Sequence, residues 1–315
     1  MSVRVISRSI PDIDVSGLLS SDPLEVFRIS NEVGKVAEKY SFFYAYGDII
    51  DEEYFHCTVK VSKMFFSLSL TEKMRSYIGI SNEHVGYVPK GEEHGDEDFK
   101  EALDFPLEFS YGKSRDFPFN NLSRSSLCPS ISGFFDFINF YFNSMVETGN
   151  LLLCAFARYL DIPINTFIKY IGKAPCQARL LHYPYDPSII GCSGIKEHTD
   201  LECITLIQQT EPGLEVMSNF DDWISIMPMP GATFVTIGDT LEFWTNGTFR
   251  ATIHRVREVA AERFSFPIFF NVTHDTEIRP LLKFMPTDIF GSPALKVGDY
   301  FHCKSIQKFA YLREN

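Results

Sequence analysis

The stretch GIKEHTDLECITLI, residues 194–207, decides how the chain is interpreted, because it joins two potential metal ligands to an apolar, strand-like run. His198 and Asp200 stand two residues apart, and on an extended backbone this spacing places both side chains on one face. They can therefore hold one ion together. A third ligand must come from a distant segment, and His254 in ATIHRVREV, which also reads as a strand, is the candidate.

Two imidazoles and one carboxylate leave one side of a metal ion open. A lone His-x-Asp pair is weak evidence for a metal site, but a third ligand inside a later strand strengthens it considerably. Zinc is the competing metal, yet a closed structural zinc site requires four ligands rich in cysteine or histidine. The carboxylate and the open face instead favour Fe(II), for which a facial set of two histidines and one carboxylate is typical.

A second pair of polar residues, Arg263 and Ser265 in ERFSFPIFFNV, shares a strand face by the same period of two. The arginine fork matches a carboxylate through two parallel hydrogen bonds, and the serine hydroxyl adds one more donor. We therefore interpret the pair as an anion site. Phe269 has the same parity and is a candidate for lining a substrate pocket, with ordinary core packing as the alternative.

The order of these motifs resembles one known family. HxD is followed after about fifty residues by the histidine, and after about ten more by RxS, as in the isopenicillin N synthase-like branch of the 2-oxoglutarate/Fe(II)-dependent dioxygenase superfamily. Four further segments agree with that branch in the same order: GLEVM, Trp223 with SIMPMPG, IGDTLEFWTNG and HRV. The resemblance implies an Fe(II)/2-oxoglutarate-dependent dioxygenase that consumes O2.

The resemblance also implies roles for particular residues. Arg263 and Ser265 are expected to hold the far carboxylate of 2-oxoglutarate, and Tyr183 in ARLLHYPYDP to donate to a carboxylate on the iron. An ordinary core position is the alternative for Tyr183. The segment 86–109 resembles the part of the family that covers the mouth of the site, which makes Tyr87 a second candidate for the substrate pocket.

The charge of the chain argues against nucleic acid as a partner. The formal net charge is −12, and no run of Lys and Arg is present to bind phosphates. One acidic cluster could bind a cation or a basic substrate, but such a cluster is more often a solvated loop, and we favour the loop: Glu92, Glu93, Asp96, Glu97 and Asp98.

The composition is that of a globular protein, with 45% hydrophobic residues, 30 Phe and 14 Tyr among 315 residues. No stretch approaches the roughly 18 apolar residues of a membrane span, and no secretory signal is evident at the N-terminus. The seven cysteines lack CxxC spacing, as expected for reduced thiols. We expect a cytoplasmic monomer that does not bind membranes and acts on a small molecule.

Periodicity predicts an α+β fold with a double-stranded β-helix (jelly-roll) core flanked by helices. Apolar residues at helical spacing predict three long helices, starting near residue 26 and spanning about 51–74 and 130–160. After residue 176, short strands punctuated by turn signals follow one another. We expect a single domain, 1–315, in three parts: a mainly helical part (1–175), the jelly-roll core with the metal site (176–275) and a closing segment ending in a helix (276–315).

Two alternatives remain open at this stage. In isopenicillin N synthase itself the RxS pair holds a carboxylate of the substrate and no 2-oxoglutarate is used, so the chain could be an oxidase of that kind. A jelly-roll binding protein without turnover is the alternative from another class. Hydroxylation, desaturation and oxidative ring closure of an amino-acid-like, peptide or specialised-metabolite substrate are all compatible with the sequence.

Overall fold

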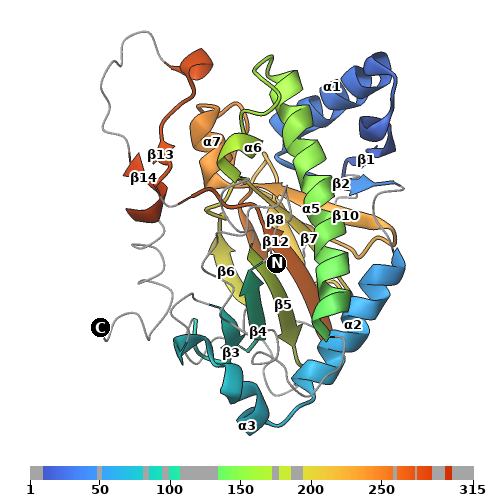
Figure 1. Cartoon of the computed structure of the whole chain (residues 1–315), viewed down its shortest axis with the longest axis vertical. Coiled ribbons are helices and arrows are strands. Elements are labelled where there is room, and N and C mark those ends of the chain that lie inside the picture. Colours follow the sequence, from blue (N-terminus) through green and yellow to red (C-terminus); the bar gives the residue numbers. More distant parts are fainter. Residues whose placement is uncertain are drawn as a thin grey trace.

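An eight-stranded sheet, here called the major sheet, dominates the computed structural model of the chain (Figure 1). All its neighbouring strands are antiparallel except β1 and β2, which pair in parallel. Its strands in spatial order are β1 (Asp12–Asp14), β2 (Phe42–Tyr46), β10 (Ala232–Ile237), β7 (Ile204–Gln209), β12 (Arg263–Phe269), β5 (Gln177–Tyr183), β4 (Glu101–Pro106) and β3 (Gly86–Val88). The structure describes residues 10–47, 52–80, 85–93, 99–106, 134–171, 177–185, 194–257, 261–273, 275–285 and 295–299.

A smaller antiparallel sheet, the minor sheet, packs against one face of the major sheet. Its strands in spatial order are β6 (Ile195–His198), β11 (His254–Val256), β8 (Leu214–Met217) and β9 (Trp223–Ser225). One apolar cluster joins residues of both sheets, among them Leu181, Ile207 and Phe234 with Leu214, Val216 and Val256. The two sheets thus enclose a common interior, which confirms the predicted two-sheet core. A separate pair of short strands, β13 (Glu277–Ile278) and β14 (Leu295–Lys296), lies beyond them.

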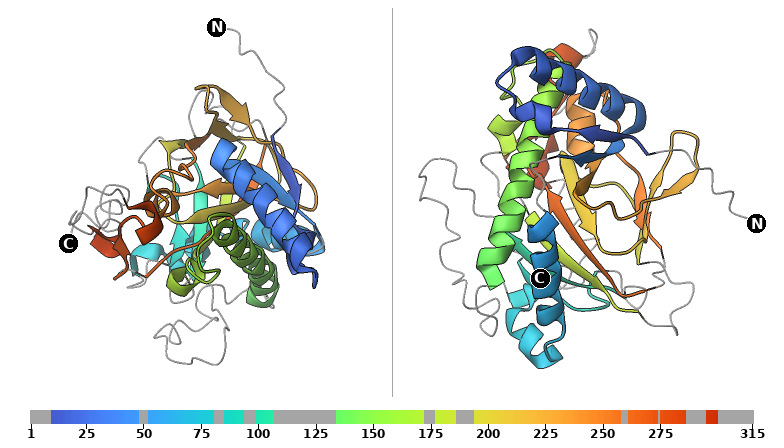
Figure 2. Two further views of the ribbon diagram at one scale, coloured as in Figure 1. Left: turned by 90° about the horizontal axis from the view of Figure 1, so that it is seen from above. Right: turned by 90° about the vertical axis from the view of Figure 1, so that its right-hand side faces the viewer.

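Helices cover the other face of the major sheet. The long helices are α1 (Pro23–Tyr40), α2 (Glu52–Phe66) and α5 (Phe134–Tyr159), and Figure 2 shows α5 running along the sheet beside α1. Helix α1 begins at Asp22, whose side chain accepts a hydrogen bond from Leu24 N, and it ends at Ser41 in the left-handed conformation. Gly34 lets α1 approach α5 closely, because a Cβ atom there would lie 2.0 Å from the Tyr159 ring.

The central strand β12 separates the two interiors. Its even-numbered residues Phe264, Phe266 and Ile268 belong to the apolar core under the helices, whereas its odd-numbered residues face the space between the sheets and line a cavity there. Both faces of a strand that lies between two packed layers are buried, which explains its continuous apolar sequence. Period-two alternation nevertheless decides which side chains reach the cavity.

The predicted second helix is wrong at its C-terminal end. Helix α2 stops at Phe66, and a capping box between Ser69 and Glu72 begins the short helix α3 (Leu70–Lys73).

The remaining short helices are η1 (Ser16–Leu19), η2 (Met74–Ser76), η3 (Ile78–Ile80), α6 (Ile168–Ile171), α7 (Asp239–Trp244) and η6 (Leu282–Phe284). Of the predicted closing helix, 296–314, residues 297–299 are helical and residues 300–314 lie outside the described ranges. None of the helices in those ranges combines the length and apolar character that a membrane crossing demands.

The N-terminal part contributes more to the β-structure than its helical pattern suggests. Strands β1 to β4 all belong to the major sheet. The segment 86–109, expected over the mouth of the site, supplies β3 and β4 to one edge of that sheet, while residues 94–98 and 107–109 lie outside the described ranges. Strands from both halves of the chain therefore form one continuous sheet.

Candidate active site

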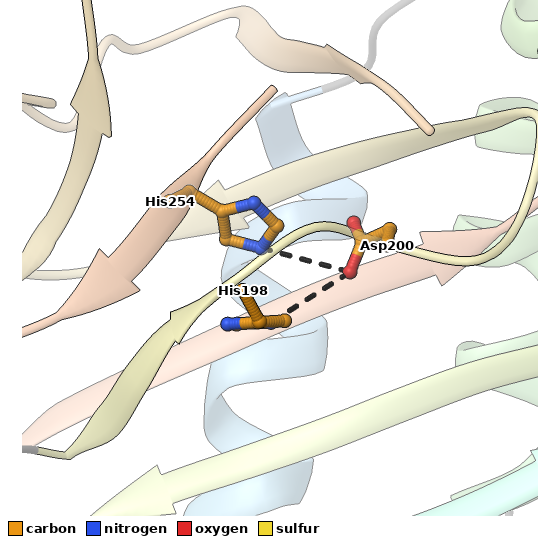
Figure 3. Close-up of side chains that lie close together, drawn as sticks. All are labelled: His198, Asp200 and His254. Carbon is orange, nitrogen blue, oxygen red and sulfur yellow. Dashed lines mark ion pairs between the residues drawn. The ribbon is translucent and has the colours of Figure 1, made fainter. Parts of the chain in front are cut away.

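The minor sheet brings the three predicted metal ligands together (Figure 3). His198 ends β6 and His254 begins β11, and the two are direct partners in the antiparallel ladder. Asp200 follows β6, and its Oδ1 lies 3.8 Å from His198 Nε2 and 3.6 Å from His254 Nε2. Ligand atoms about 2.1 Å from one metal ion are separated by roughly 3–3.5 Å, so the observed distances are only slightly longer than a shared ion requires. Within the described ranges this is the one group of at least three such residues that could hold a metal.

Hydrogen bonds to the far side of each ligand orient it toward a common centre. His198 Nδ1 lies 2.8 Å from Lys196 O, and His254 Nδ1 lies 3.0 Å from Thr252 O. A carbonyl oxygen only accepts, so each Nδ1 donates and each Nε2 presents its lone pair inward. Thr205 Oγ1 donates to Asp200 Oδ2 at 2.5 Å, which leaves Oδ1 directed at the histidines. The ligands are therefore already arranged for metal binding.

The loop that carries Asp200 is held by the N-terminus of α7. Asp239 N donates to Asp200 O at 2.8 Å, and Gly238 N donates to Cys203 O at 2.9 Å. Gly238 permits this approach, because a Cβ atom there would lie 2.1 Å from Glu202 O. The turn signal at Gly238 and Asp239 is visible in the sequence, but its contact with the metal loop is not.

The triad opens into a cavity of about 550 Å³ between the two sheets. The side chains of Asp200 and His254 are buried, whereas that of His198 is 37% exposed, so the cavity opens on the side of His198. A larger cavity, of about 930 Å³, lies beside α6, α7 and residues 273–285 and is lined by none of the predicted site residues. The smaller cavity is therefore the candidate active site.

Arg263 lines this cavity as a buried cation that contacts only neutral acceptors. Its side chain is 1% exposed, with Nε 3.2 Å from Glu211 O and Nη2 2.6 Å from Gln209 Oε1. Its Nη1 has no hydrogen-bond partner among the described residues. Burial lowers the pKa of the Arg263 guanidinium from its ordinary value, and Tyr183 opposes this effect. A donor buried in this way is matched by an anionic ligand.

Three other predicted residues reach the cavity with Arg263. Ser265 and Phe269 follow it on the same face of β12, and Tyr183 on β5 is its direct cross-strand partner. The Tyr183 ring lies under the guanidinium, 4.6 Å from the guanidinium carbon. The structure thus brings the predicted anion site, Arg263 and Ser265, and the triad to one cavity.

Tyr87 is not among the residues that line this cavity. It packs in the apolar core and donates to Glu101 Oε2 at 2.5 Å. Glu101 also accepts from Lys73 Nζ at 2.6 Å and contacts His182 Nδ1 at 2.8 Å. Burial raises the pKa of Glu101, but the hydrogen bonds from His182, Lys73 and Tyr87 outweigh it and lower the pKa to about 2. Tyr87 therefore belongs to a structural ion cluster.

A second arginine, absent from the sequence-based prediction, also lines the cavity. Arg179 forms a buried ion network with Asp104, Glu93 and Lys100, which we call the wall cluster. Glu93 is buried, so the interpretation of this residue as part of a solvated loop is wrong; residues 96–98 lie outside the described ranges. Arg179 could have been found from the sequence, because it lies four residues before Tyr183 on one strand and therefore shares its face. Thr205, five residues after Asp200, carried no comparable signal.

Comparison with known proteins agrees with this geometry. Residues 175–272 match the 2OG-Fe(II) oxygenase superfamily, and residues 10–124 match the family described as non-haem dioxygenase in morphine synthesis N-terminal. The homoarginine-6-hydroxylase of Oryza sativa subsp. japonica is 27% identical, covering 87% of this chain and 89% of that protein. The 1-aminocyclopropane-1-carboxylate oxidase of Dictyostelium discoideum is also 27% identical, over 88% of this chain and 84% of its own length.

A solved structure from Neurospora crassa, in complex with alpha-KG (2-oxoglutarate) and thymine, has the same fold. It superposes with a TM-score of 0.77 at 23% identity, covering 92% of this chain and 94% of that one. The likeness covers most of the chain, and it confirms the predicted jelly-roll architecture.

Proposed function

Because the chain belongs to the 2OG-Fe(II) oxygenase superfamily, we propose that it oxidises a small organic molecule at an Fe(II) ion held by His198, Asp200 and His254. The protein is an enzyme, and its cofactors are Fe(II) and 2-oxoglutarate, with O2 as the oxidant. The proposed outcome is hydroxylation, desaturation or oxidative ring closure of the substrate.

The donor set of the triad supports iron as its metal. Two neutral imidazoles and one carboxylate, all on one side, suit Fe(II) and leave the opposite side open. The inward Nε2 atoms of His198 and His254 and the Oδ1 atom of Asp200 are the proposed ligand atoms. Thr205 keeps Asp200 in position through its hydrogen bond to Oδ2.

The observation that carries the proposal is the buried guanidinium of Arg263, which lacks a carboxylate partner among the described residues. Keeping a cation buried without a counter-ion costs free energy, and an anionic ligand removes that cost. We assign the far carboxylate of 2-oxoglutarate to Arg263 Nη1 and the Ser265 hydroxyl. The Tyr183 ring packs against one face of the Arg263 guanidinium.

The side chains of the cavity position the co-substrate and exclude water from the reaction. Bound together, Fe(II), 2-oxoglutarate and O2 provide an oxidant strong enough for an unactivated C–H bond. Arg263 and Ser265 hold one end of the co-substrate, and the triad lies toward the other, so both face one enclosed space. The buried side chains of Asp200 and His254 close the inner end of that space against water.

The substrate is proposed to be a small molecule, as in the relatives. Their names and ligands cover three charge types: cationic homoarginine, zwitterionic 1-aminocyclopropane-1-carboxylate and uncharged thymine. Homoarginine and thymine are therefore suitable probes for the charge that this cavity accepts.

One structural observation and one measurement separate the alternatives. A binding protein without turnover has no requirement for a complete triad beside an uncompensated arginine, and both features are present. In an oxidase that does not use 2-oxoglutarate, Arg263 would instead bind a carboxylate of the substrate. Dependence on 2-oxoglutarate therefore distinguishes the two enzymes.

The experiment is an anaerobic titration of the purified protein with Fe(II) and then with 2-oxoglutarate, followed by the visible charge-transfer band of the chelated iron. The wild-type protein is expected to bind one Fe(II) and to develop the band. His254→Ala should lose the metal, while His56→Ala, a variant of a surface histidine whose side chain is 67% exposed, should behave as wild type. Equal iron binding by the His254→Ala variant would refute the assigned metal site.

A further inference from the structure

The cavity has two ends, which the strand registers define. Arg263 and Tyr183 pair at one end, and six residues later Phe269 is level with Gln177 on β5 and with Thr205 on β7. Because Thr205 holds Asp200, the row of Phe269 marks the metal end of the cavity and the row of Arg263 marks the anion end.

Arg179 lies toward the metal end on β5, which pairs with β12 on the side opposite β7. It precedes Tyr183 by four residues and follows Gln177 by two, so all three side chains point to the cavity face of β5. A C–H bond to be oxidised must lie beside the metal. If the proposed function holds, Arg179, Gln177 and Phe269 are therefore the polar and aromatic side chains nearest to the substrate on this wall.

The charge of Arg179 is already balanced, unlike that of Arg263. Its Nε and Nη2 contact the two oxygens of Asp104 at 2.6 and 2.5 Å, and its Nη1 lies 2.7 Å from Glu93 Oε1. Glu93 Oε2 in turn lies 2.5 Å from Lys100 Nζ. Among the described residues, the wall cluster therefore contains two cations and two carboxylates, and it is buried. An anionic substrate would add a further negative charge beside Asp104 and Glu93, and a cationic one would face Arg179 itself.

Arg179 can still donate hydrogen bonds to a neutral acceptor. A guanidinium carries five N–H groups, and three of them are used by Asp104 and Glu93 among the described residues. Two donors remain, which suit a carbonyl oxygen. Gln177, half-buried on the same wall, holds its amide by one long bond of 3.3 Å from Nε2 to Asp104 Oδ2, and its amide oxygen suits an N–H donor. The partly exposed Phe269 ring offers a flat apolar surface.

We propose that the wall cluster selects an uncharged substrate that carries a carbonyl beside an N–H group, as in an amide or lactam. Arg179 and Gln177 are the specificity-determining residues, and Glu93 and Asp104 hold Arg179 in a charge-balanced state. This proposal rests on the proposed function for the location of the metal, but it concerns the metal end of the cavity and not the anion end, where Arg263 and Ser265 are proposed to hold 2-oxoglutarate.

The test measures anaerobic binding of probes to the full-length protein loaded with Fe(II) and 2-oxoglutarate, by calorimetry and by the shift of the visible band. The uncharged probes are thymine and 2-piperidone, and the charged ones are orotate and homoarginine. At least one uncharged probe is expected to bind about tenfold more tightly than either charged probe, the scale of one or two hydrogen bonds. Equal or tighter binding of a charged probe, or no binding of either uncharged probe, overturns the proposal.

Two variants make the test specific. Glu93→Gln removes one balancing charge, so binding of orotate should strengthen about tenfold relative to thymine. Gln177→Leu, whose amide makes one long bond to Asp104, should weaken binding of the uncharged probes about tenfold. Arg28→Gln, on the surface, is the matched control. Unchanged selectivity in both site variants, with the 2-oxoglutarate band intact, refutes this inference alone; loss of the band in the wild-type protein refutes the proposed function instead.

Discussion

Replacing Arg263 by Lys tests how the co-substrate is anchored. The substitution keeps a positive charge at the buried position but removes the planar fork. In the structure, Nε and Nη2 of Arg263 are already engaged by Glu211 O and Gln209 Oε1, and Nη1 is the nitrogen left for a ligand. A lysine has one nitrogen at its end, so it cannot satisfy Gln209, Glu211 and a carboxylate with the same geometry.

The magnitude follows from the bond that is lost. A charge-assisted hydrogen bond contributes about 1.5–3 kcal/mol, and each 1.4 kcal/mol or so corresponds to about a tenfold change in affinity. Arg263→Lys should therefore weaken 2-oxoglutarate binding about 10- to 150-fold. Fe(II) binding should remain near the wild-type value, because none of the three ligands lies on β12: His198 ends β6, Asp200 follows it and His254 begins β11.

The assay is an anaerobic titration of the iron-loaded protein with 2-oxoglutarate, and Arg28→Lys, an exposed arginine, is the control. Retention of wild-type affinity in Arg263→Lys would show that the carboxylate is held elsewhere. Parallel loss of iron binding would show that the variant had damaged the fold and not only the anion end.

Three further predictions follow from contacts around the site. Thr205→Val removes the 2.5 Å hydrogen bond to Asp200 and should weaken Fe(II) binding about tenfold in a metal titration. Gly238→Ala places a Cβ atom 2.1 Å from Glu202 O, so urea unfolding should show a loss of about 1–3 kcal/mol. Because the pKa of Glu101 is lowered to about 2, its stabilisation is complete above the unfolded-state pKa near 4.3 and is lost as pH falls toward 2; Glu101→Gln should flatten the dependence of urea unfolding on pH in that window.

The triad was predictable from sequence because period-two spacing acts over short distances. The spacing of His198 and Asp200 placed two ligands on one face, and the cross-strand partner of His198 proved to be His254. The same alternation identified Arg263, Ser265 and Phe269 as cavity residues. Local periodicity is sufficient in these cases because each set lies on one strand or on its immediate neighbour.

The interactions that the sequence did not predict depend on how separate segments of the chain pack together. Glu93 was interpreted as part of a solvated loop because an acidic run has that appearance, yet Arg179 and Lys100 bury it. Tyr87 was assigned to the pocket from its segment alone, whereas Glu101 draws its hydroxyl into the core. Such pairings depend on strand order in the major sheet, which periodicity does not determine.

The most direct test of the central claim is to measure how much succinate forms for each O2 consumed. The Fe(II)-loaded protein is incubated in air with 2-oxoglutarate, with and without the probe that binds best, and succinate and O2 are measured together. The account predicts that succinate forms in proportion to the O2 consumed, that both require 2-oxoglutarate, and that Asp200→Ala forms none. Oxygen consumption without 2-oxoglutarate and without succinate, or equal succinate formation by Asp200→Ala, would contradict it.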